Sequence, residues 1–524
     1  MMHSLQKIYL LILCLFLFNT AFATNYYVDN NATGNNSGSS WTNAWQSFAD
    51  INWSLIQPGD IIYISGGSSS KTYFETLNIG THGEPGNNVL ISKGIDPGHN
   101  GDVVIDGQDI RECGIDFNSS DDYVTVRGFT IRNTTSSCIL MVGGVTGSSG
   151  NYGWSNPIVG SRVEYCKMHL TNRRGVYAKG TTRLYFYRNV ITTSSNTSAE
   201  TDGFFSQASS YNTWDGDSII ISNNNDGPHC DGIQINQDTS DIVKNCYIEQ
   251  DNSKSSNAQG IYATQCGGNF IYYNNVVNLT QSNSNGIVLS NIGGGSASVE
   301  IYNNVVFSQN GADHAIWCRY QVSPPIIKNN IVRSLSGGFG TIVVTGSNTS
   351  GVSHNSITGG SSVGSSVITS DPLFTDELNG IFTLQENSPC IDAGTNLSAP
   401  FNVDKNGKSR PQGNGWDIGA YEMVFGPASN GGSTVIPEEF YLSQNYPNPF
   451  NPSTQILVNL PIGQEIKLSV YNMLGELVSE LANGEYTAGT HKFEFAASGL
   501  PTGIYFYRIE SPEFSATKKM VFMR

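Results

Sequence analysis

The chain has 524 residues, of which 27 are lysine or arginine and 43 are aspartate or glutamate, so its formal net charge is −16. This acidity disfavours nucleic acid and anionic membranes as general partners, although a local basic patch is compatible with it. Charged residues make up only 13% of the chain, and its 57 glycines indicate many exposed tight turns.

Residues 1–23 have the pattern of a secretory signal peptide. Lys7 precedes an apolar run from Ile8 to Phe18, and the segment ends in a small-x-small sequence at Ala21 and Ala23. The apolar run is too short to anchor the chain in a bilayer. We therefore expect export to the periplasm, with no membrane span after signal removal.

Eight cysteines remain after the signal, in a compartment that permits disulfides. Cys113 and Cys138 are 25 residues apart, about one structural repeat, and are the best candidates for a bridge. Cys318 is expected to be buried. No CxxC or Cys/His spacing indicates zinc.

The segment 25–62 is predicted to cap the first domain, residues 24–424. Strand-like runs flank an amphipathic stretch from about Ala44 to Ile56, which is expected to form a short helix over the open end of the sheets. With Gly80-Thr-His-Gly-Glu-Pro-Gly and Val89-Leu-Ile-Ser, this opening resembles the entry to secreted β-helix polysaccharide lyases.

A unit of about 28 residues then repeats through the middle of the chain. A glycine or alanine followed by alternating apolar residues recurs with steps of 28, 29, 28, 26 and 29 residues, at Gly175, Gly203, Gly232, Gly260, Gly286 and Ala315. An asparagine recurs between these copies with steps of 30, 29 and 26 residues, at Asn245, Asn275, Asn304 and Asn330. A fixed period in this range marks a solenoid or propeller.

The repeat predicts a parallel β-helix. Each unit contains short β-branched runs with period two and no helical periodicity. The motifs of leucine-rich, RTX and propeller repeats are missing, and stacked asparagines can hydrogen-bond along a solenoid. Residues 60–370 resemble the right-handed parallel β-helix, pectate-lyase-like superfold. A Gly/Ser-rich insertion between Gly143 and Gly160 interrupts the repeat, and insertions in solenoids often mark the binding face.

Alternation along the strands predicts two outward columns and a row of residues just before each glycine. The first column is Asp116, Leu140, Tyr177, Phe205, Gln234, Tyr262, Val288 and Trp317. The second is Asn118, Val142, Lys179, Gln207, Asn236, Thr264, Ser290 and Arg319. The row before the glycines is Arg174, Asp202, Asp231, Gln259, Asn285 and His314.

Exposed rings beside amides, carboxylates and cations are what a sugar-binding groove needs. Ordinary turn chemistry is the alternative explanation of an aspartate before a glycine. The candidate substrate-binding residues are Arg173, Tyr177, Phe205, Gln207, Gln234, Asn236, Tyr262 and Trp317. The candidate catalytic residues are Lys179, His229, Asp202, Asp231 and Arg174.

Two reactions fit these candidates. In β-elimination on an acidic polysaccharide, Lys179, His229 or Tyr177 would be the base, and Arg173 or Arg174 would neutralise the uronate carboxylate. Calcium could assist, with the candidate ligands Glu200, Asp202, Asp226 and Asp231. In hydrolysis, Asp202 and Asp231 would act as paired carboxylates, and Glu200-Thr-Asp202 resembles the Glu-x-Asp arrangement of β-helix carrageenan hydrolases. The sequence slightly favours the lyase. A glycan-binding or adhesive protein without activity is the third hypothesis.

The end of the chain is predicted to form a separate module. Residues 371–424 lose the period and are assigned a capping role, and the Gly/Ser-rich segment 425–439 has the composition of a flexible linker. Residues 440–524 predict a small antiparallel β-sandwich. The run Asn445-Tyr-Pro-Asn-Pro-Phe-Asn-Pro and the strand Gly503-Ile-Tyr-Phe-Tyr-Arg resemble the C-terminal sorting domain of type IX secretion. That resemblance implies recognition by the type IX machinery and release or attachment at the outer-membrane surface.

Overall fold

The protein is all-β and divides into two compact units, residues 1–425 and 426–524. The computed structural model describes residues 23–146, 153–170, 173–193, 201–222, 230–251, 258–280, 284–311, 313–321, 323–336, 341–345, 348–361 and 363–424 of the first unit. In the second unit it describes residues 441–443, 445, 448, 450–460, 463–473, 475–487, 489–497, 499–511 and 515–523. The predicted signal peptide, apart from Ala23, and the predicted linker lie outside these ranges, as do residues 147–152 of the insertion. No helix among the described residues is long and apolar enough to cross a membrane.

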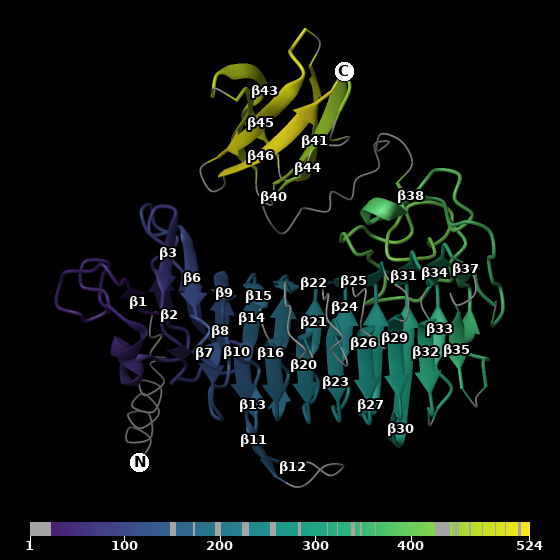
Figure 1. The fold of residues 1–524 in the computed structure, drawn as a ribbon, viewed down its shortest axis with the longest axis horizontal. Helices are drawn as coiled ribbons and strands as arrows, with labels where there is room; N and C mark the ends of the chain where they lie inside the picture. The colour runs from purple at the N-terminus through teal and green to yellow at the C-terminus, as the bar shows by residue number, and fades with distance from the viewer. Residues whose placement is uncertain are drawn as a thin grey trace, which may run out of the picture. The chain divides into compact units, whose positions relative to one another are not determined.

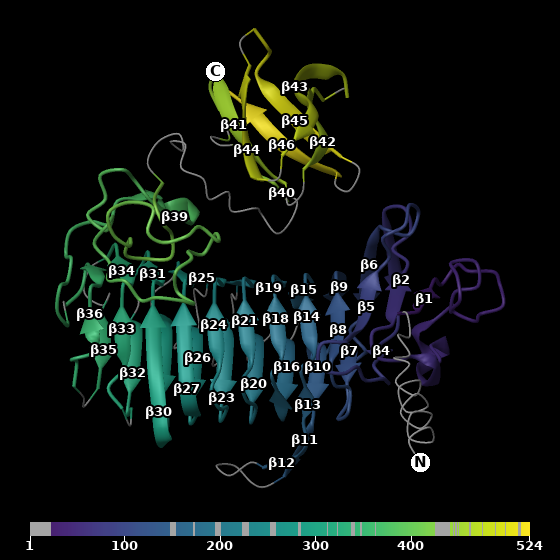
Figure 2. The same ribbon diagram turned by 180° about the vertical axis from the view of Figure 1, so that it is seen from behind.

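The first unit is a parallel β-solenoid whose coils each contribute one strand to three long sheets (Figures 1 and 2). Sheet A has 12 strands: β1 (Asn25–Val28), β2 (Ile61–Ile64), β5 (Val89–Lys93), β8 (Val124–Arg127), β14 (Arg162–Glu164), β18 (Tyr185–Tyr187), β21 (Thr213–Asp215), β24 (Ile242–Lys244), β27 (Gly267–Tyr273), β30 (Gly293–Tyr302), β33 (Ile326–Lys328) and β36 (Val352–Ser353).

Sheet B has 11 strands: β3 (Ser70–Tyr73), β6 (Asp102–Asp106), β9 (Phe129–Arg132), β15 (Lys167–Leu170), β19 (Val190–Thr193), β22 (Ser218–Ser222), β25 (Tyr247–Asp251), β28 (Val276–Leu279), β31 (Val305–Ser308), β34 (Ile331–Ser334) and β37 (Ser356–Thr358). Sheet C has 10 strands: β4 (Leu77–Asn78), β7 (Cys113–Phe117), β10 (Ser137–Val142), β16 (Arg174–Lys179), β20 (Asp202–Gln207), β23 (Ile233–Asn236), β26 (Ala258–Thr264), β29 (Ser284–Ser290), β32 (His314–Arg319) and β35 (Ile342–Val344). The predicted parallel β-helix is confirmed.

Two short pairs of strands accompany these sheets. An antiparallel hairpin, β11 (Gly144–Thr146) with β12 (Gly153–Asn156), belongs to the predicted insertion. A parallel pair, β13 (Ile158–Val159) with β17 (Thr181–Thr182), follows it. The insertion therefore leaves the solenoid at the corner between sheets C and A.

The repeated glycine of sheet C is required because successive coils approach closely there. A Cβ atom on Gly203 would lie 2.5 Å from the carbonyl oxygen of Gly232 and 2.6 Å from Ile219 Cγ2. Gly175, Gly232 and Gly286 meet the next coil in the same way. The 28-residue period thus reflects a steric requirement of the stack.

A ladder of asparagines holds the tight corner between sheets A and B. Asn304 Oδ1 accepts hydrogen bonds from the backbone N and the Nδ2 of Asn275, at 2.9 and 3.0 Å, and Asn330 does the same for Asn304. The prediction is confirmed for these three residues. It is wrong by one position for Asn245, which has a left-handed φ of 56°, and Cys246 occupies the ladder position, its N donating to Asn275 Oδ1. Both corner positions suit asparagine, so composition did not separate them.

The N-terminal cap consists of two 3₁₀ turns, η1 (Phe48–Asp50) and η2 (Trp53–Leu55), where the sequence indicated one amphipathic helix. Ser47 and Asn52 each accept a hydrogen bond from a backbone N–H of the turn that follows, so two caps five residues apart divide the segment. Its apolar residues join the solenoid core, as expected of a lid.

The predicted bridge between Cys113 and Cys138 is wrong. Cys113 pairs with Ser137, and Ile115 pairs with Ile139, so the strand register leaves Cys138 one residue out of line with Cys113. A disulfide requires facing Cβ atoms. All eight described cysteines are buried and free, and Cys318 is fully buried, as predicted.

The last part of the first unit covers outer faces of the solenoid near its end. The hairpin β38 (Phe374–Asp376) and β39 (Ile381–Leu384), with η3 (Glu377–Asn379) between its strands, packs with Phe307 and Ile331 of sheet B. Phe401 packs on Tyr273 and Tyr302 of sheet A, with ring centroids 5.0 and 4.8 Å apart. In these two clusters the described cap residues pack on strands of sheets A and B and on none of sheet C.

The second unit consists of two small antiparallel sheets around a shared apolar core. One sheet contains β40 (Tyr441–Leu442), β41 (Ser453–Leu460) and β44 (Gly489–Ala496). The other contains β43 (Leu477–Tyr486), β42 (Gln464–Tyr471), β45 (Gly503–Glu510) and β46 (Ser515–Phe522). The predicted antiparallel β module is confirmed.

Candidate functional site

The outer face of sheet C aligns the predicted columns as expected. In the first column, Tyr177 pairs with Phe205, Phe205 with Gln234, and Gln234 with Tyr262. The pairing continues through Val288 to Trp317. In the second column, Lys179 pairs with Gln207 and Gln207 with Asn236. Residues one repeat apart are therefore neighbours in space.

Exposure differs along these columns. Partly exposed side chains occur on each coil from β16 to β26 and again on β32: Tyr177, Lys179, Gln207, Gln234, Asn236, Tyr262 and Trp317. Arg173, just before β16, is exposed. Phe205 and Val288, which were predicted to be exposed, are covered, with 9% and 2% of their surfaces accessible. The ring of Phe205 contributes to the face mainly as packing.

Phe205 is covered because an arginine lies on it. The guanidinium of Arg174 is 4.3 Å from the Phe205 ring centroid and 5.1 Å from that of Tyr177, and the two rings are 5.4 Å apart. Such cation–π contacts are worth about 0.5–2 kcal/mol each. The Tyr177 hydroxyl donates to Gln207 Oε1 at 3.1 Å. Arg174 and Tyr177 are thereby held in a fixed arrangement at one end of the face.

Asp202 and Asp231 do not lie on the exposed face, so that prediction is wrong. Both are 0% exposed. Asp202 Oδ1 accepts from the backbone N of Asp231 at 3.1 Å, and Asp231 Oδ1 accepts from the backbone N of Gln259 at 2.8 Å. Asp202 Oδ2 also lies 3.5 Å from Arg174 Nε. One oxygen of each carboxylate therefore links its coil to the next, where the chain enters sheet C.

A second aromatic and cationic group lies on β32. The His314 ring stacks on Trp317 at 4.1 Å, and the Arg319 guanidinium lies 4.2 Å from the Trp317 ring centroid. Trp317 Nε1 donates to Thr345 Oγ1 at 3.2 Å. Burial, aided by Arg319, lowers the pKa of His314 against the opposing effect of Asp313. The sequence columns contained His314 and Arg319, but only their contacts with Trp317 indicate that they share a site.

Six strands in the middle of sheet C have a charge opposite to that of the whole chain, although partly exposed Asp116 lies on β7 and exposed Asp313 directly precedes β32. The six strands β16, β20, β23, β26, β29 and β32 carry the cations Arg174, Lys179 and Arg319. Among their described residues the only carboxylate is Asp202, which is fully buried. A protein with a net charge of −16 thus presents a locally cationic surface of rings and amides.

The remaining site predictions lie outside the described residues. Glu200, Asp226 and His229 belong to segments that join sheet B to sheet C and are not among the described ranges. Within the described ranges, no group of three or more His, Cys, Asp or Glu side chains is placed to hold a metal ion. The predicted calcium ligands and the predicted histidine base therefore remain hypotheses.

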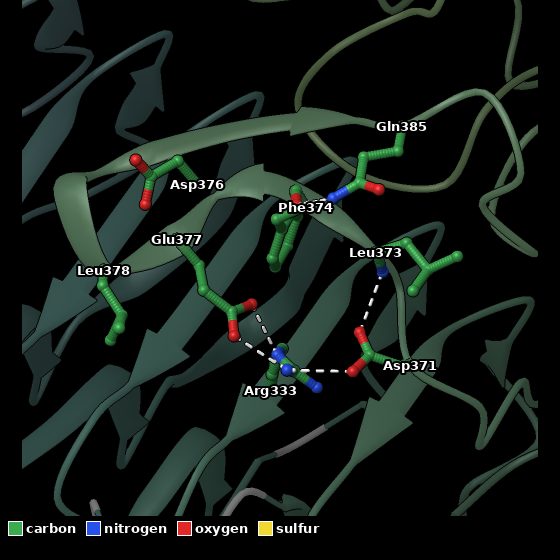
Figure 3. A pocket seen from close by; sticks show the side chains of 8 residues that line it. All are labelled: Arg333, Asp371, Leu373, Phe374, Asp376, Glu377, Leu378 and Gln385. Atoms are coloured by element: carbon green, nitrogen blue, oxygen red, sulfur yellow. Dashed lines mark hydrogen bonds and ion pairs between the residues drawn. The ribbon is translucent and has the colours of Figure 1, made fainter.

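A small pocket of about 250 Å³ lies where the C-terminal cap meets Arg333 of β34 in sheet B (Figure 3). Glu377 accepts from Arg333 at 2.6 and 2.7 Å, and Asp371 lies 3.0 Å from the same guanidinium. Against the opposing effect of burial, Glu377 and Asp371 raise the pKa of Arg333. The arginine is saturated by carboxylates of the cap, so this cluster has a structural role in joining the cap to sheet B.

Comparisons with solved structures return β-helix proteins at low similarity. The GH136 lacto-N-biosidase from Eubacterium ramulus is 10% identical over 59% of this chain and 67% of that one, with a TM-score of 0.32. Tailspike protein 2 of the Escherichia coli O157:H7 bacteriophage CAB120 is 10% identical over 89% of this chain and 64% of that one, with a TM-score of 0.19. The chain thus spans about two thirds of the length of these proteins. Structural similarity this low does not indicate the activity of this chain.

The C-terminal unit has a defined family. No curated protein matches the chain. Residues 444–523 match the secretion system C-terminal sorting domain, in agreement with the resemblance carried by residues 440–524. The protein is therefore an exported β-solenoid that ends in a secretion system C-terminal sorting domain, and it is secreted or placed at the cell surface.

Proposed function

We propose that the solenoid binds an anionic polysaccharide along the outer face of sheet C and cleaves it by β-elimination. One observation carries the proposal: the described residues of six consecutive strands present rings, amides and cations and expose no carboxylate. Tyr177, Tyr262 and Trp317 can stack on sugar C–H faces, while Gln207, Gln234 and Asn236 can take hydroxyl groups. Arg174, Lys179 and Arg319 supply the charge that favours an acidic polymer over a neutral one.

The face is long enough for several sugar units. Six neighbouring coils at a spacing of about 4.8 Å extend over about 24 Å. The Arg174–Tyr177–Phe205 group lies at one end of this run and the His314–Trp317–Arg319 group at the other. An extended polymer is therefore a better fit than a small ligand.

Lys179 is the proposed base. In the elimination, Lys179 Nζ takes the proton at C5 of a uronate, the electron pair forms the C4–C5 double bond, and the C4–O bond breaks. The leaving oxygen takes a proton from water. Arg173, which is exposed, and Arg174 are the candidates to neutralise the carboxylate and stabilise the charge that develops beside C5. Burial of Asp202 and Asp231 disfavours the hydrolase, which needs two accessible carboxylates.

The test is a turnover assay on polygalacturonate, alginate, carrageenan and a glycosaminoglycan, read by the ultraviolet absorbance of the unsaturated uronate and by reducing ends. We expect both signals to rise together on one acidic polymer. Lys179→Ala should abolish them, whereas Lys167→Ala, on the exposed face of sheet B in the same coil, should not.

Other outcomes refute parts of the proposal. Reducing ends without the absorbance would identify a hydrolase, and binding without either would identify a glycan-binding protein. An arm with a calcium chelator tests the predicted metal, for which Glu200 and Asp226 are the remaining candidate ligands. Full turnover in Lys179→Ala would exclude Lys179 as the base.

A further inference from the structure

A second group of rings and cations lies on the outer face of sheet A. Tyr185 and Tyr187 stand two residues apart on β18, with ring centroids 5.9 Å apart, and Tyr165 meets Tyr187 edge to face at 5.3 Å. The guanidinium of Arg162 is 4.5 Å from the Tyr185 ring centroid, and that of Arg188 is 5.1 Å from the Tyr187 ring centroid. The three rings are partly exposed. Two adjacent coils thus display stacked aromatic and guanidinium groups away from sheet C.

The corners that border these strands hold large side chains in the left-handed conformation. At the corner between sheets A and B, the left-handed position is Gly216, Asn245, Asn274, Asn303, Asn329 or His354 in later coils, but Tyr165 and Arg188 here, with φ of 53° and 51°. At the other corner, Arg183 has a φ of 55°, and the same position holds Tyr123, Gly160, Tyr211, Ser240 and Gly268 in other coils. A bulky residue in this conformation is uncommon. The left-handed corners of these two coils therefore place Tyr165 and Arg188 against the ring of Tyr187.

The charge of this region is positive. Arg127 and Arg162 share a single carboxylate, Glu164, at 2.6 Å each, and Glu164 is 3% exposed. Arg183 and Arg188 are exposed and add two further cations. Nearby Asp215 accepts from Tyr185 at 2.5 Å and pairs with Lys244 at 3.1 Å, so it is balanced. Among the described residues of this region, with the Asp215–Lys244 pair counted as neutral, four arginines and one glutamate sum to a formal charge of +3.

Near the end of the solenoid, the aromatic rings on the outer face of sheet A are covered. There the aromatic residues Tyr273 and Tyr302 are covered by Phe401 of the cap and form a small apolar cluster with Trp416. Tyr273 and Tyr302 are 6% exposed, while Tyr185 and Tyr187 remain partly exposed. Rings on this sheet are therefore buried where they serve packing, and those on β18 are kept accessible beside arginines.

We propose that Arg162, Tyr165, Arg183, Tyr185, Tyr187 and Arg188, the sheet A patch, form a second binding site for an anionic polysaccharide. Tyrosine rings stack on the C–H faces of sugars, and guanidinium groups bind carboxylates or sulfates in a bidentate manner. The patch lies on a different sheet from the proposed cleavage site, so it holds the polymer without taking part in the reaction. Two sites on one rigid solenoid raise the effective concentration of the chain segments near sheet C. The patch does not depend on the reaction proposed for sheet C.

The test compares three variants of the full chain by affinity electrophoresis and titration calorimetry, with polygalacturonate, alginate and chondroitin sulfate as probes and neutral dextran as a blank. The patch variant is Arg183→Gln with Arg188→Gln. Its charge-matched control is Lys167→Gln with Lys492→Gln, which changes exposed residues on sheet B and on the second unit. The sheet C variant is Tyr177→Ala with Tyr262→Ala.

We expect the patch variant to lose about tenfold or more in affinity for an acidic polymer, since hydrogen bonds to charged groups are worth about 1.5–3 kcal/mol each. Its affinity should also depend less steeply on salt. The control should bind like the parent protein. Turnover of a short oligosaccharide should be unchanged in the patch variant, because a short chain cannot reach both sites.

The outcomes separate this proposal from the one for sheet C. Loss of binding in the patch variant with retention in the sheet C variant supports the patch even if no polymer is cleaved. Equal affinity in the patch variant and its control overturns the proposal and leaves the sheet C proposal intact. Binding of dextran that also depends on Arg183 and Arg188 would overturn the anionic assignment.

Discussion

Replacing Asn304 by alanine tests how strongly the asparagine ladder holds the solenoid together. The side chain makes four hydrogen bonds: Oδ1 accepts from Asn275 N at 2.9 Å and from Asn275 Nδ2 at 3.0 Å, while Nδ2 donates to Tyr272 O at 2.9 Å and to Asn330 Oδ1 at 3.0 Å. All four groups are buried. Alanine removes these bonds, so the backbone N–H of Asn275 stays buried and loses Asn304 Oδ1 as its acceptor. We expect a loss of about 3–5 kcal/mol in the free energy of unfolding.

The assay is urea denaturation followed by tryptophan fluorescence. All seven tryptophans lie at or before residue 416, so the signal reports the first unit alone. The control is Asn414→Ala, whose side chain is exposed, and it should unfold like the parent protein. The midpoint for Asn304→Ala should fall with an unchanged slope. A loss below about 1 kcal/mol would show that the ladder follows from the packing of the coils and does not stabilise it.

Three other predictions follow from the site and the core. Lys179→Ala should abolish formation of the unsaturated product. It should change the dissociation constant for polymer by less than about tenfold, since the aromatic contacts remain. Loss of polymer binding in this variant would instead make Lys179 a binding residue. Asp202→Asn, which keeps an acceptor for the amide of Asp231, should retain turnover and lower the unfolding midpoint slightly, and a folded but inactive variant would return Asp202 to the catalytic candidates. Burial, against hydrogen bonds from Asn189, raises the pKa of Asp217 to about 8. Between about pH 4 and pH 8 the folded state therefore holds a proton that the unfolded state has released. The contribution of Asp217 to the free energy of unfolding should be largest below about pH 4 and should be lost as pH rises through about 8. Denaturation at several pH values should show this decline, and Asp217→Asn should flatten it.

The register of the solenoid was predictable because both the alternation along each strand and the length of each coil can be read from residue spacing in the sequence. The steps between Gly175, Gly203, Gly232 and Gly260 correctly placed Tyr177, Phe205, Gln234 and Tyr262 in one column. The reason is steric: each of these glycines lies against the carbonyl oxygen of the equivalent glycine in the next coil, so a glycine is needed once per coil and the coil length can be read from the sequence. The sorting domain was predictable for a similar reason, since its turn and strand motifs are contiguous.

Accessibility was not predictable from these patterns. An aspartate before a glycine can be a turn residue or a site residue, and only the structure reveals that Asp202 and Asp231 are buried, with one oxygen of each accepting from the backbone of the next coil. Phe205 alternates outward as expected, yet Arg174 lies over its ring. The sheet A patch was missed because its residues come from two strands and their corners, and none of them belongs to the glycine repeat.

The sequence by itself determined that this is a β-solenoid with a sorting module and which residues of successive coils are neighbours, because period and alternation act along the chain. The tertiary structure alone decided which of those neighbours reach solvent, which carboxylates bond to the backbone, and where cations gather on an acidic protein. Those properties depend on what lies across a coil or over a sheet, and such contacts join residues that no local pattern connects.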